Sequence, residues 1–317
     1  MSSRDVWPEL PYEAWKETCL TLQLWTQIAG KIRLRQTPWL NHSWHVVLYV
    51  SSRGLTTSPI PYADRTFQLD FDFLDHMLWV STSDGGRGRV ALRPRSVADF
   101  YADLMRSLSA LGIEIRINEL PNEIPNAIRF SEDDVHASYD GEFAQRFWRI
   151  LVQSARVLDR FRTSFIGKCS PVHFFWGSFD LAVTRFSGRP ASPLPSGSGS
   201  VPNMPASVVL DAYSHEVSSA GFWPGGQGVD DPAFYSYAAP SPPGFDKAAV
   251  RPAQAFWSRD LNQYLLPYDA VRTAGEPEEM LMEFLISTYE AAASAGNWDR
   301  AALECPLGVP GVPRKVE

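Results

Sequence analysis

Residues 66–73 constrain the fold of this chain more than any other segment, because apolar and polar side chains alternate strictly along them. The apolar positions are Phe67, Leu69, Phe71 and Phe73, and the polar ones are Gln68, Asp70 and Asp72. A period of two is the pattern of a β-strand with one buried face. The next apolar stretches, 77–80 and 89–92, follow after links too short for parallel crossovers, so we expect antiparallel hairpins.

Helical patterns flank these strands. Residues 11–29 have apolar side chains at helical spacing, and Gly30 is placed to end that helix. Ser96 and Asp99 resemble a capping box at the start of a second helix. Further helices are predicted over residues 141–165, over residues 252–265 and from Pro277 onward. Further strands are predicted over residues 44–50, 113–117, 172–176, 178–186, 208–217 and 233–238. The fold class predicted from these patterns is α+β.

The second part of the chain repeats several features of the first in the same order. A helix ending at Gly30-Lys31 is matched by one ending at Gly167-Lys168, and the string Asp-x-x-x-His occurs at both Asp72 and Asp211. We interpret this as an internal duplication, with two similar halves, each of antiparallel strands flanked by helices, about a pseudo-two-fold axis. The predicted boundaries are 1–118 for the first half, 119–140 for a connector, 141–300 for the second half with a Pro-, Ser- and Gly-rich loop at 187–206, and 301–317 for a C-terminal tail.

Composition limits the class of protein. With 29 basic and 36 acidic side chains the net charge is −7, which argues against a nucleic-acid-binding protein. No apolar run approaches the roughly 20 residues of a membrane-spanning helix, so we expect no membrane partner. The three cysteines, Cys19, Cys169 and Cys305, are far apart, and the N-terminal residues lack the apolar core of a secretion signal. We therefore expect a cytoplasmic protein with reduced thiols.

Histidines near carboxylates are the sharpest candidates for chemistry. The catalytic candidates are His76, His215, Asp72, Asp211 and Glu216. Imidazole and carboxylate are the ligand set of a divalent metal in hydrolases, and His76, His215 and Glu216 are the metal candidates. Asp72 and His76 would lie about 13 Å apart on a continuous strand, so a shared site needs ligands from both halves. The alternative is that these histidines only cap strand ends or bond within a sheet.

Aromatic side chains beside glycine and proline indicate a second kind of site. The candidate ligand-binding residues are Trp176, Phe222, Trp223, His42, His45 and His173. Rings in turn regions can line a pocket for a flat or apolar ligand, although core packing explains them equally well.

The helix predicted over residues 141–165 carries several arginines. They are Arg146, Arg149, Arg156, Arg160 and Arg162. They could bind an anionic ligand, but a solvated or salt-bridged face is the favoured interpretation.

Three hypotheses for function follow. The first is a small-molecule enzyme, hydrolytic or assisted by a divalent metal, with its site between the halves. The second is a non-catalytic protein that binds a small molecule in an aromatic pocket. The third is a protein-interaction module that uses the arginine-bearing helix and the loop at 187–206.

Four segments together resemble a known family. They are residues 41–50, 170–189, 211–216 and 221–225. The chain resembles, over nearly its whole length, a family of mostly bacterial proteins catalogued only as a domain of unknown function. That resemblance implies a soluble single-chain protein, and it carries over no activity, cofactor or catalytic residue.

Overall fold

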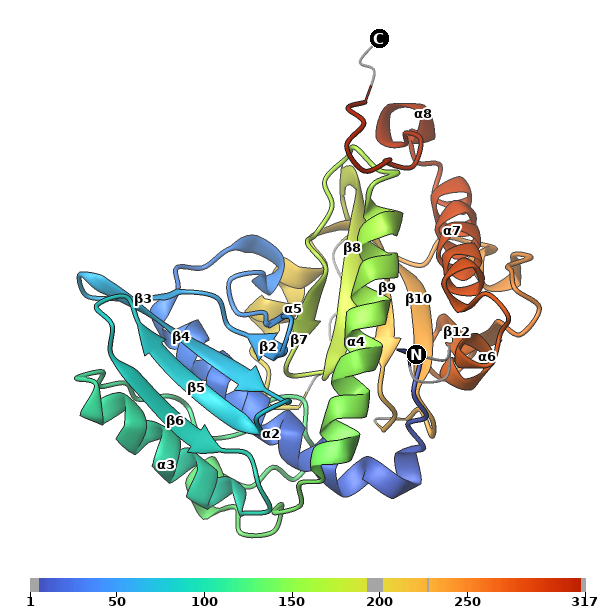
Figure 1. Ribbon diagram of the computed structural model, residues 1–317. Helices are drawn as coiled ribbons and strands as arrows, with labels where there is room; N and C mark the ends of the chain where they lie inside the picture. The colour runs from blue at the N-terminus through green and yellow to red at the C-terminus, as the bar shows by residue number, and fades with distance from the viewer. Residues whose placement is uncertain (1–5, 193–201, 227, 315–317) are drawn as a thin grey trace.

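Two antiparallel sheets with helices packed against them make up the fold, which is α+β (Figure 1). The computed structural model describes residues 6–192, 202–226 and 228–314. The helices in these ranges are α2 (Tyr12–Gln36), α3 (Val97–Ala110), α4 (Gly141–Arg162), α5 (Ala206–Ala212), α6 (Tyr268–Arg272), α7 (Pro277–Ala295) and α8 (Arg300–Leu303), with short 3-10 turns η1 (Asn41–Ser43), η2 (Phe130–Glu132) and η3 (Phe245–Lys247). None of these helices is both long and apolar enough to cross a membrane.

The first sheet has the strand order β1-β2-β4-β5-β6, and β3 also pairs with β4. Its strands are β1 (Tyr49–Val50), β2 (Gly54–Thr56), β3 (Ile60–Tyr62), β4 (Arg65–Asp72), β5 (Met77–Thr82) and β6 (Arg87–Ala91). The alternation seen in the sequence is confirmed, because Phe67, Leu69 and Phe71 are buried on one face of β4. That face packs on α3, where Phe100 lies 6.5 Å from Phe71 and stacks on Trp25 of α2 at 4.6 Å.

Helix α2 is longer than the sequence pattern predicts. It does not end at Gly30 but continues to Gln36. The reason is packing, since the ring of Trp176 lies directly on Gly30 and a Cβ there would overlap it. Glycine at this position therefore serves close contact inside a helix, not helix termination.

The second sheet has the strand order β11-β12-β10-β9-β8-β7. Its strands are β7 (His173–Phe175), β8 (Asp180–Pro190), β9 (His215–Trp223), β10 (Ala233–Ala239), β11 (Phe256–Ser258) and β12 (Gln263–Pro267). Helices α4 and α7 lie against one face (Figure 1), and Arg185 of β8 points to that face because it contacts Phe161 of α4 and Tyr289 of α7. Since side chains alternate along a strand, Asp180, Thr184 and Phe186 lie on the opposite face.

Several predicted elements are wrong in type. Residues 208–217 are not one strand: Pro205 precedes the short helix α5, and strand β9 begins only at His215. Residues 252–265 do not form a helix but the β11–β12 hairpin, in which Trp257 and Tyr264 pair across the strands with rings 4.9 Å apart. This aromatic pair outweighs the helical pattern in the sequence.

Other predicted elements are shorter or shifted. Ile113 and Ile115 are buried as the alternation suggests, but residues 113–117 find no neighbouring strand and form no ladder. Of residues 44–50 only Tyr49 and Val50 belong to a strand, because residues 44–46 form a turn after η1 and Leu48 makes only an isolated bridge with Phe174. The loop predicted at 187–206 begins as the end of β8, where Pro190 pairs with His215. Its central residues, 193–201, lie outside the described residues.

Candidate active site

His76 and Asp72 lie together at the turn between β4 and β5, as the sequence suggested, but their contacts are local. Asp72 accepts hydrogen bonds from Nε of Arg53 at 2.5 Å and from the backbone N–H groups of Leu74 and Asp75. His76 has a left-handed backbone, and its Nδ1 lies 2.8 Å from the hydroxyl of Tyr139. Asp72 therefore closes the turn, and His76 anchors the turn to Tyr139, two residues before α4.

His215 and Asp211 lie elsewhere, beside His42. The carboxylate of Asp211 accepts a hydrogen bond from the backbone N–H of His42 at 2.8 Å. The rings of His42 and His215 lie edge to face at 5.9 Å, and Nζ of Lys168 is 2.7 Å from Nε2 of His42. The structure thus brings residues from both parts of the chain into one polar cluster, and the sequence analysis had named three of its members.

His76 and His215 do not share a site. His76 contacts the N-terminal end of α4 through Gln145, whereas the cluster of His42 and His215 meets Lys168, which follows the C-terminal end. A helix of 22 residues is about 33 Å long. Within the described parts of the chain, no three His, Cys, Asp or Glu side chains are grouped to hold a metal ion. Glu216, the third metal candidate, is paired with Arg189 at 2.6 Å.

The aromatic candidates are largely core residues. Trp176 is buried, and its indole N–H donates to the carbonyl of Val46 at 2.8 Å. Phe222 is fully buried against Phe234 and Tyr268. Trp223 follows Phe222 on β9 and so points to the opposite face, which carries Asp180. Trp223 is therefore placed at a polar surface, while Trp176 and Phe222 hold the fold together.

The two remaining histidines of this set are buried and serve local structure. His45 has Nδ1 at 3.2 Å from both the N–H and the carbonyl of Leu40. His173 has Nδ1 at 2.7 Å from the carbonyl of Pro171. Burial lowers the pKa of both rings, and that of His173 falls to about 4. Each ring is therefore uncharged near neutral pH.

The arginines of α4 fit the salt-bridged interpretation. Arg156 and Arg160 pair with Glu278 and Glu279 of α7 at 3.1 and 2.6 Å. The partner of this face is therefore α7.

The strongest candidate for chemistry is a pair of carboxyl groups, the buried Asp180 and the partly buried Glu123, neither of which the sequence pattern singles out. Asp180 is the first residue of β8, follows Phe179 in a left-handed conformation and is 5% exposed. Its carboxylate accepts hydrogen bonds from the hydroxyls of Ser178 and Tyr235. No arginine or lysine pairs with it among the described residues. Burial raises the pKa of Asp180 to about 6 despite the two hydroxyl donors.

Glu123, in the segment between the two sheets, completes the pair. It has a left-handed backbone with φ of 64°, and its side chain lies against Gly177, where a Cβ would overlap the carboxyl group. Burial, and next the negative charge of Asp180, raise the pKa of Glu123 to about 7. Non-glycine residues in the left-handed region carry backbone strain, which concentrates at functional sites.

Helix α2 positions Glu123 through buried polar side chains. The amide of Gln27 bonds both the carbonyl and the N–H of Asn122 at 2.9 Å, and Lys31 donates to the carbonyl of Leu120 at 2.8 Å. Gln23 donates to the carbonyl of Gly177 at 2.7 Å. The same helix therefore fixes the backbone next to Glu123 and the loop that leads to Asp180.

Hydroxyl groups extend the site along the sheet. Tyr237 of β10 pairs in register with Ser219 of β9, and Tyr213 lies close to Tyr237. The hydroxyls of Thr184 and Ser219 are 2.9 Å apart. Burial raises the pKa of each of these tyrosines and of Tyr235, so their hydroxyls keep their protons and act as donors. The ring of Trp223 lies 4.8 Å from Tyr235 and adds an aromatic surface.

Two signals in the sequence could have indicated this site. Asp180 is a lone carboxylate within an apolar strand, and buried carboxylates need a structural or chemical reason. Tyr235 and Tyr237 alternate on β10 and so share a face with it. The position of Glu123 could not be anticipated, because contacts of α2 with the connector determine it.

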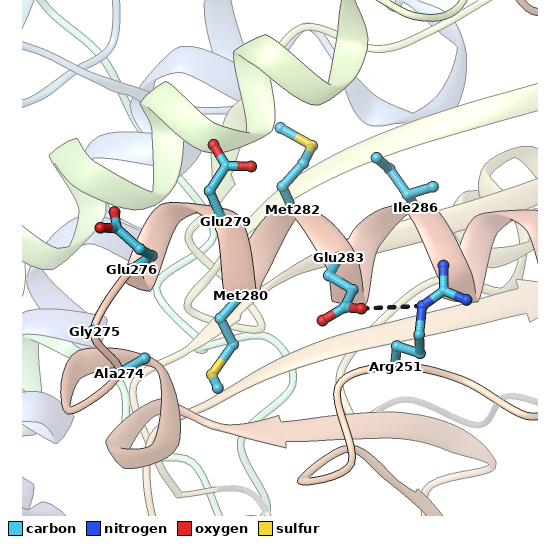
Figure 2. Close-up of a pocket in the computed structure, with 9 residues that line it drawn as sticks. All are labelled: Arg251, Ala274, Gly275, Glu276, Glu279, Met280, Met282, Glu283 and Ile286. Atoms are coloured by element: carbon cyan, nitrogen blue, oxygen red, sulfur yellow. Dashed lines mark ion pairs between the residues drawn. The ribbon is translucent and has the colours of Figure 1, made fainter.

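A hollow elsewhere on the surface lacks these features. It has a volume of about 590 Å³ and lies along the N-terminal half of α7 (Figure 2). Its carboxylates include Glu283, paired with Arg251 at 3.0 Å, and Glu279, paired with Arg160. Ion-paired, exposed carboxylates of this kind are weak candidates for acid–base chemistry.

The fold and the site together define an α+β protein with a pair of carboxyl groups at the face of its second sheet opposite α4 and α7. The chain belongs to the DUF5996 family, a family of unknown function, whose model matches residues 7–305. No curated protein and no solved structure shows significant similarity to it.

Proposed function

We propose that the protein is a small-molecule enzyme in which Glu123 and Asp180 perform general acid–base catalysis. One observation carries the proposal: the negative charge of Asp180 acts on Glu123, and the pKa values of the two carboxyl groups rise to about 7 for Glu123 and about 6 for Asp180. Such a pair holds about one proton near neutral pH, because the second ionisation places like charges close together. A group that can both donate and accept a proton at working pH is what acid–base catalysis requires.

The hydrogen bonds suggest separate roles for the two groups. Asp180 accepts from Ser178 and Tyr235, which stabilises its ionised form. Glu123 has the higher pKa and holds the shared proton. In this proposal Glu123 is the general acid and Asp180 is the base or the stabiliser of developing positive charge. Hydrolysis of a glycosidic or ester bond suits this division of labour.

The lining supports a neutral, oxygen-rich substrate. Hydroxyl groups of Tyr213, Tyr235 and Tyr237 are donors with raised pKa values, and Trp223 adds an apolar ring surface. No lysine or arginine pairs with the carboxyl groups in the part of the chain that the structure describes. Sugars and polar esters match a surface of hydroxyls with an aromatic ring.

In this proposal a substrate reaches the pair when residues 202–212, which we call the cover, move away from the connector. The carbonyl of Pro202 accepts from the N–H of Glu123 at 2.8 Å, and the side chain of Asn203 donates to the carbonyl of Pro121 at 3.0 Å. Helix α5, just beyond, has no buried residue. Hydrogen bonds to the connector and, through Asp211 and Ala212, to His42 hold this segment, but α5 buries no residue. Its opening therefore costs little hydrophobic free energy.

The proposed site differs in its residues from the His and carboxylate site that the sequence predicts between the halves. Glu123 comes from residues 119–140, Asp180 from the second sheet and the supporting amides from α2, so the site lies where these parts meet. If turnover needs a divalent metal, we expect Glu123 and Asp180 as ligands, because hard cations prefer carboxylate oxygen. His76 and His215 are too far apart to share it.

We also place the protein in the cytoplasm and retain the internal duplication. The three cysteines, all described, are free. In both parts a long helix, α2 or α4, precedes an antiparallel sheet, and α3 or α7 follows it. The matched Asp-x-x-x-His strings do not support it, since Asp72 ends a strand whereas Asp211 lies in a helix.

The test compares wild-type protein with Glu123→Gln and Asp180→Asn on a panel of chromogenic glycosides and esters. Asp134→Asn, an exposed carboxylate, is the matched control. We expect turnover to fall by roughly 100-fold or more in both site variants and to stay unchanged in the control. Carbon-13 NMR titration provides a second readout. Ordinary pKa values for both carboxyl groups, or full activity in both variants, would overturn the proposal.

A further inference from the structure

Lys168 occupies an unusual position on the same sheet face, away from the carboxyl pair. It follows α4, and its carbonyl accepts from the N–H of Phe186 at 3.0 Å. Phe186 lies six residues along β8 from Asp180, which is about 20 Å on a strand. Any role of Lys168 is therefore separate from the proposed acid–base site and does not rest on it.

Aromatic rings and one imidazole hold the ammonium group of Lys168. Nζ lies 4.5 Å from the ring centroid of Phe186 and 5.4 Å from that of Trp44. It also donates to Nε2 of His42 at 2.7 Å. Long lysine side chains at a surface normally sample many rotamers, so three contacts on one ammonium group make a preorganised cation.

The state of His42 follows from its neighbours. Nδ1 of His42 lies 3.1 Å from the carbonyl of Ala212, so it carries the proton and donates it there. Nε2 is then the acceptor for Lys168. Burial lowers the pKa of His42, and the charge of Lys168 adds to that effect, so the ring is uncharged near neutral pH. Of the three N–H bonds of Lys168, one is used and two are left for a ligand.

The cation has no carboxylate partner within ion-pair distance in the described ranges. The carboxylate of Asp211 is nearby, but it accepts from the backbone N–H of His42. His42 and Ser43 are both left-handed, with φ of 58°. The strained backbone at His42 therefore places its imidazole where it orients Lys168. Within the described residues, no carboxylate uses the ammonium group that is oriented in this way.

We propose that Lys168, oriented by His42 and flanked by His215, binds an oxyanion, the carboxylate or phosphate group of a small molecule. The ammonium group supplies two charge-assisted hydrogen bonds, and the rings of Trp44 and Phe186 exclude water from one side. Lys168 is exposed, so a ligand reaches it without movement of the sheet. His42 acts as a positioning residue.

The test titrates inorganic phosphate and, separately, acetate into the full-length protein and follows the ring resonances of His42 and His215 by NMR. Lys168→Met removes the cation, Lys168→Arg keeps a charge, and Lys247→Met is the exposed control. We expect saturable shifts in wild type and the control, binding weakened by roughly tenfold or more in Lys168→Met, and partial recovery in Lys168→Arg. Tighter binding of one probe identifies phosphate or carboxylate as the ligand group.

Two outcomes would overturn the proposal. One is the absence of saturable shifts at either histidine with both probes. The other is equal binding by wild type and Lys168→Met. Thermal melting of each variant without ligand shows whether it is folded, and if Lys168→Met is not, the comparison rests on Lys168→Arg and on an added Lys168→Gln variant.

Discussion

Tyr235 reaches Asp180 across an intervening strand. Tyr235 lies on β10 and Asp180 on β8, with β9 between them, and the phenol hydroxyl donates to the carboxylate. Gly221 of β9 makes the crossing possible, because Tyr235 pairs with Gly221 and the ring passes over it. A side chain at that position would fill the space that the phenol occupies.

Replacement of Gly221 by alanine should therefore destabilise the protein and disturb the site. A Cβ there would overlap the carbonyl of Leu181 and lie 2.6 Å from the hydroxyl of Tyr235. We expect the free energy of unfolding to fall by about 1–3 kcal/mol, as for overpacked cores. Urea denaturation measures it. Gly275→Ala, where nothing lies within 4 Å of the new Cβ, is the control and should change little.

The carboxyl pair should make stability depend on pH. The pKa values of Glu123 and Asp180 rise on folding from 4.5 and 3.8 to about 7 and about 6. Below pH 3.8 both groups are protonated in both states, so their contribution is fully present. As pH rises, the unfolded chain releases these protons first, and the free energy of unfolding falls until pH reaches about 7.

Comparison with the double variant Glu123→Gln, Asp180→Asn isolates this effect from other titrating groups. Each unit of pKa shift corresponds to about 1.4 kcal/mol, so the wild type should lose a few kcal/mol relative to the variant over this range. Denaturation curves at several pH values measure the difference. A difference that stays constant with pH would contradict the expected burial of the pair.

His173 should change the free energy of unfolding with pH in the opposite direction from the carboxyl pair. Burial lowers its pKa on folding from 6.5 to about 4. The stability that depends on its neutral form is present above pH 6.5 and is lost as pH falls toward 4, because the unfolded chain takes up the proton first. The loss is on the order of 3 kcal/mol. His173→Asn keeps a donor for the carbonyl of Pro171 without titrating. It should remove this acid sensitivity, and a variant as acid-sensitive as wild type would refute the assignment.

Gln27 should control the pKa of Glu123 from a distance. Its amide holds Asn122 by two hydrogen bonds, so Gln27→Leu releases the connector and exposes Glu123 to water. We expect the pKa of Glu123 to fall from about 7 toward its ordinary 4.5. Carbon-13 NMR of labelled glutamate measures it. The partly exposed amide variant Gln153→Leu, on α4, is the control. An unchanged pKa of Glu123 in Gln27→Leu would show that other contacts hold Glu123.

The parts of the fold that local pattern determines could be predicted from the sequence. The alternation in β4 and the cap of α3 by Ser96, which accepts from the N–H of Asp99, are both confirmed. Local pattern failed where distant packing decides. Gly30 ends no helix because Trp176 packs on it, and residues 252–265 form a hairpin because Trp257 meets Tyr264.

The candidate site shows the same division. Sequence reasoning named His42, Asp211 and His215, which the fold brings together, but it paired His215 with His76 at the other end of α4. It passed over Glu123 and Asp180, since a carboxylate reveals its burial only when the layers around it are known. The type of a residue indicates which chemistry it can perform. Long-range contacts determine which of these residues lie together in one site.

The buried polar side of α2 determines how the protein responds to substitutions far from the site. Lys31 is almost fully buried and donates to the carbonyl of Leu120, while Trp25 on the other side of the helix stacks on Phe100 of α3, which packs on the first sheet. Helix α2 thus contacts both the layer of the first sheet and the connector that carries Glu123. Loosening of the first sheet will be transmitted to the proton affinity of Glu123, so substitutions far from the carboxyl pair should alter its chemistry without touching it.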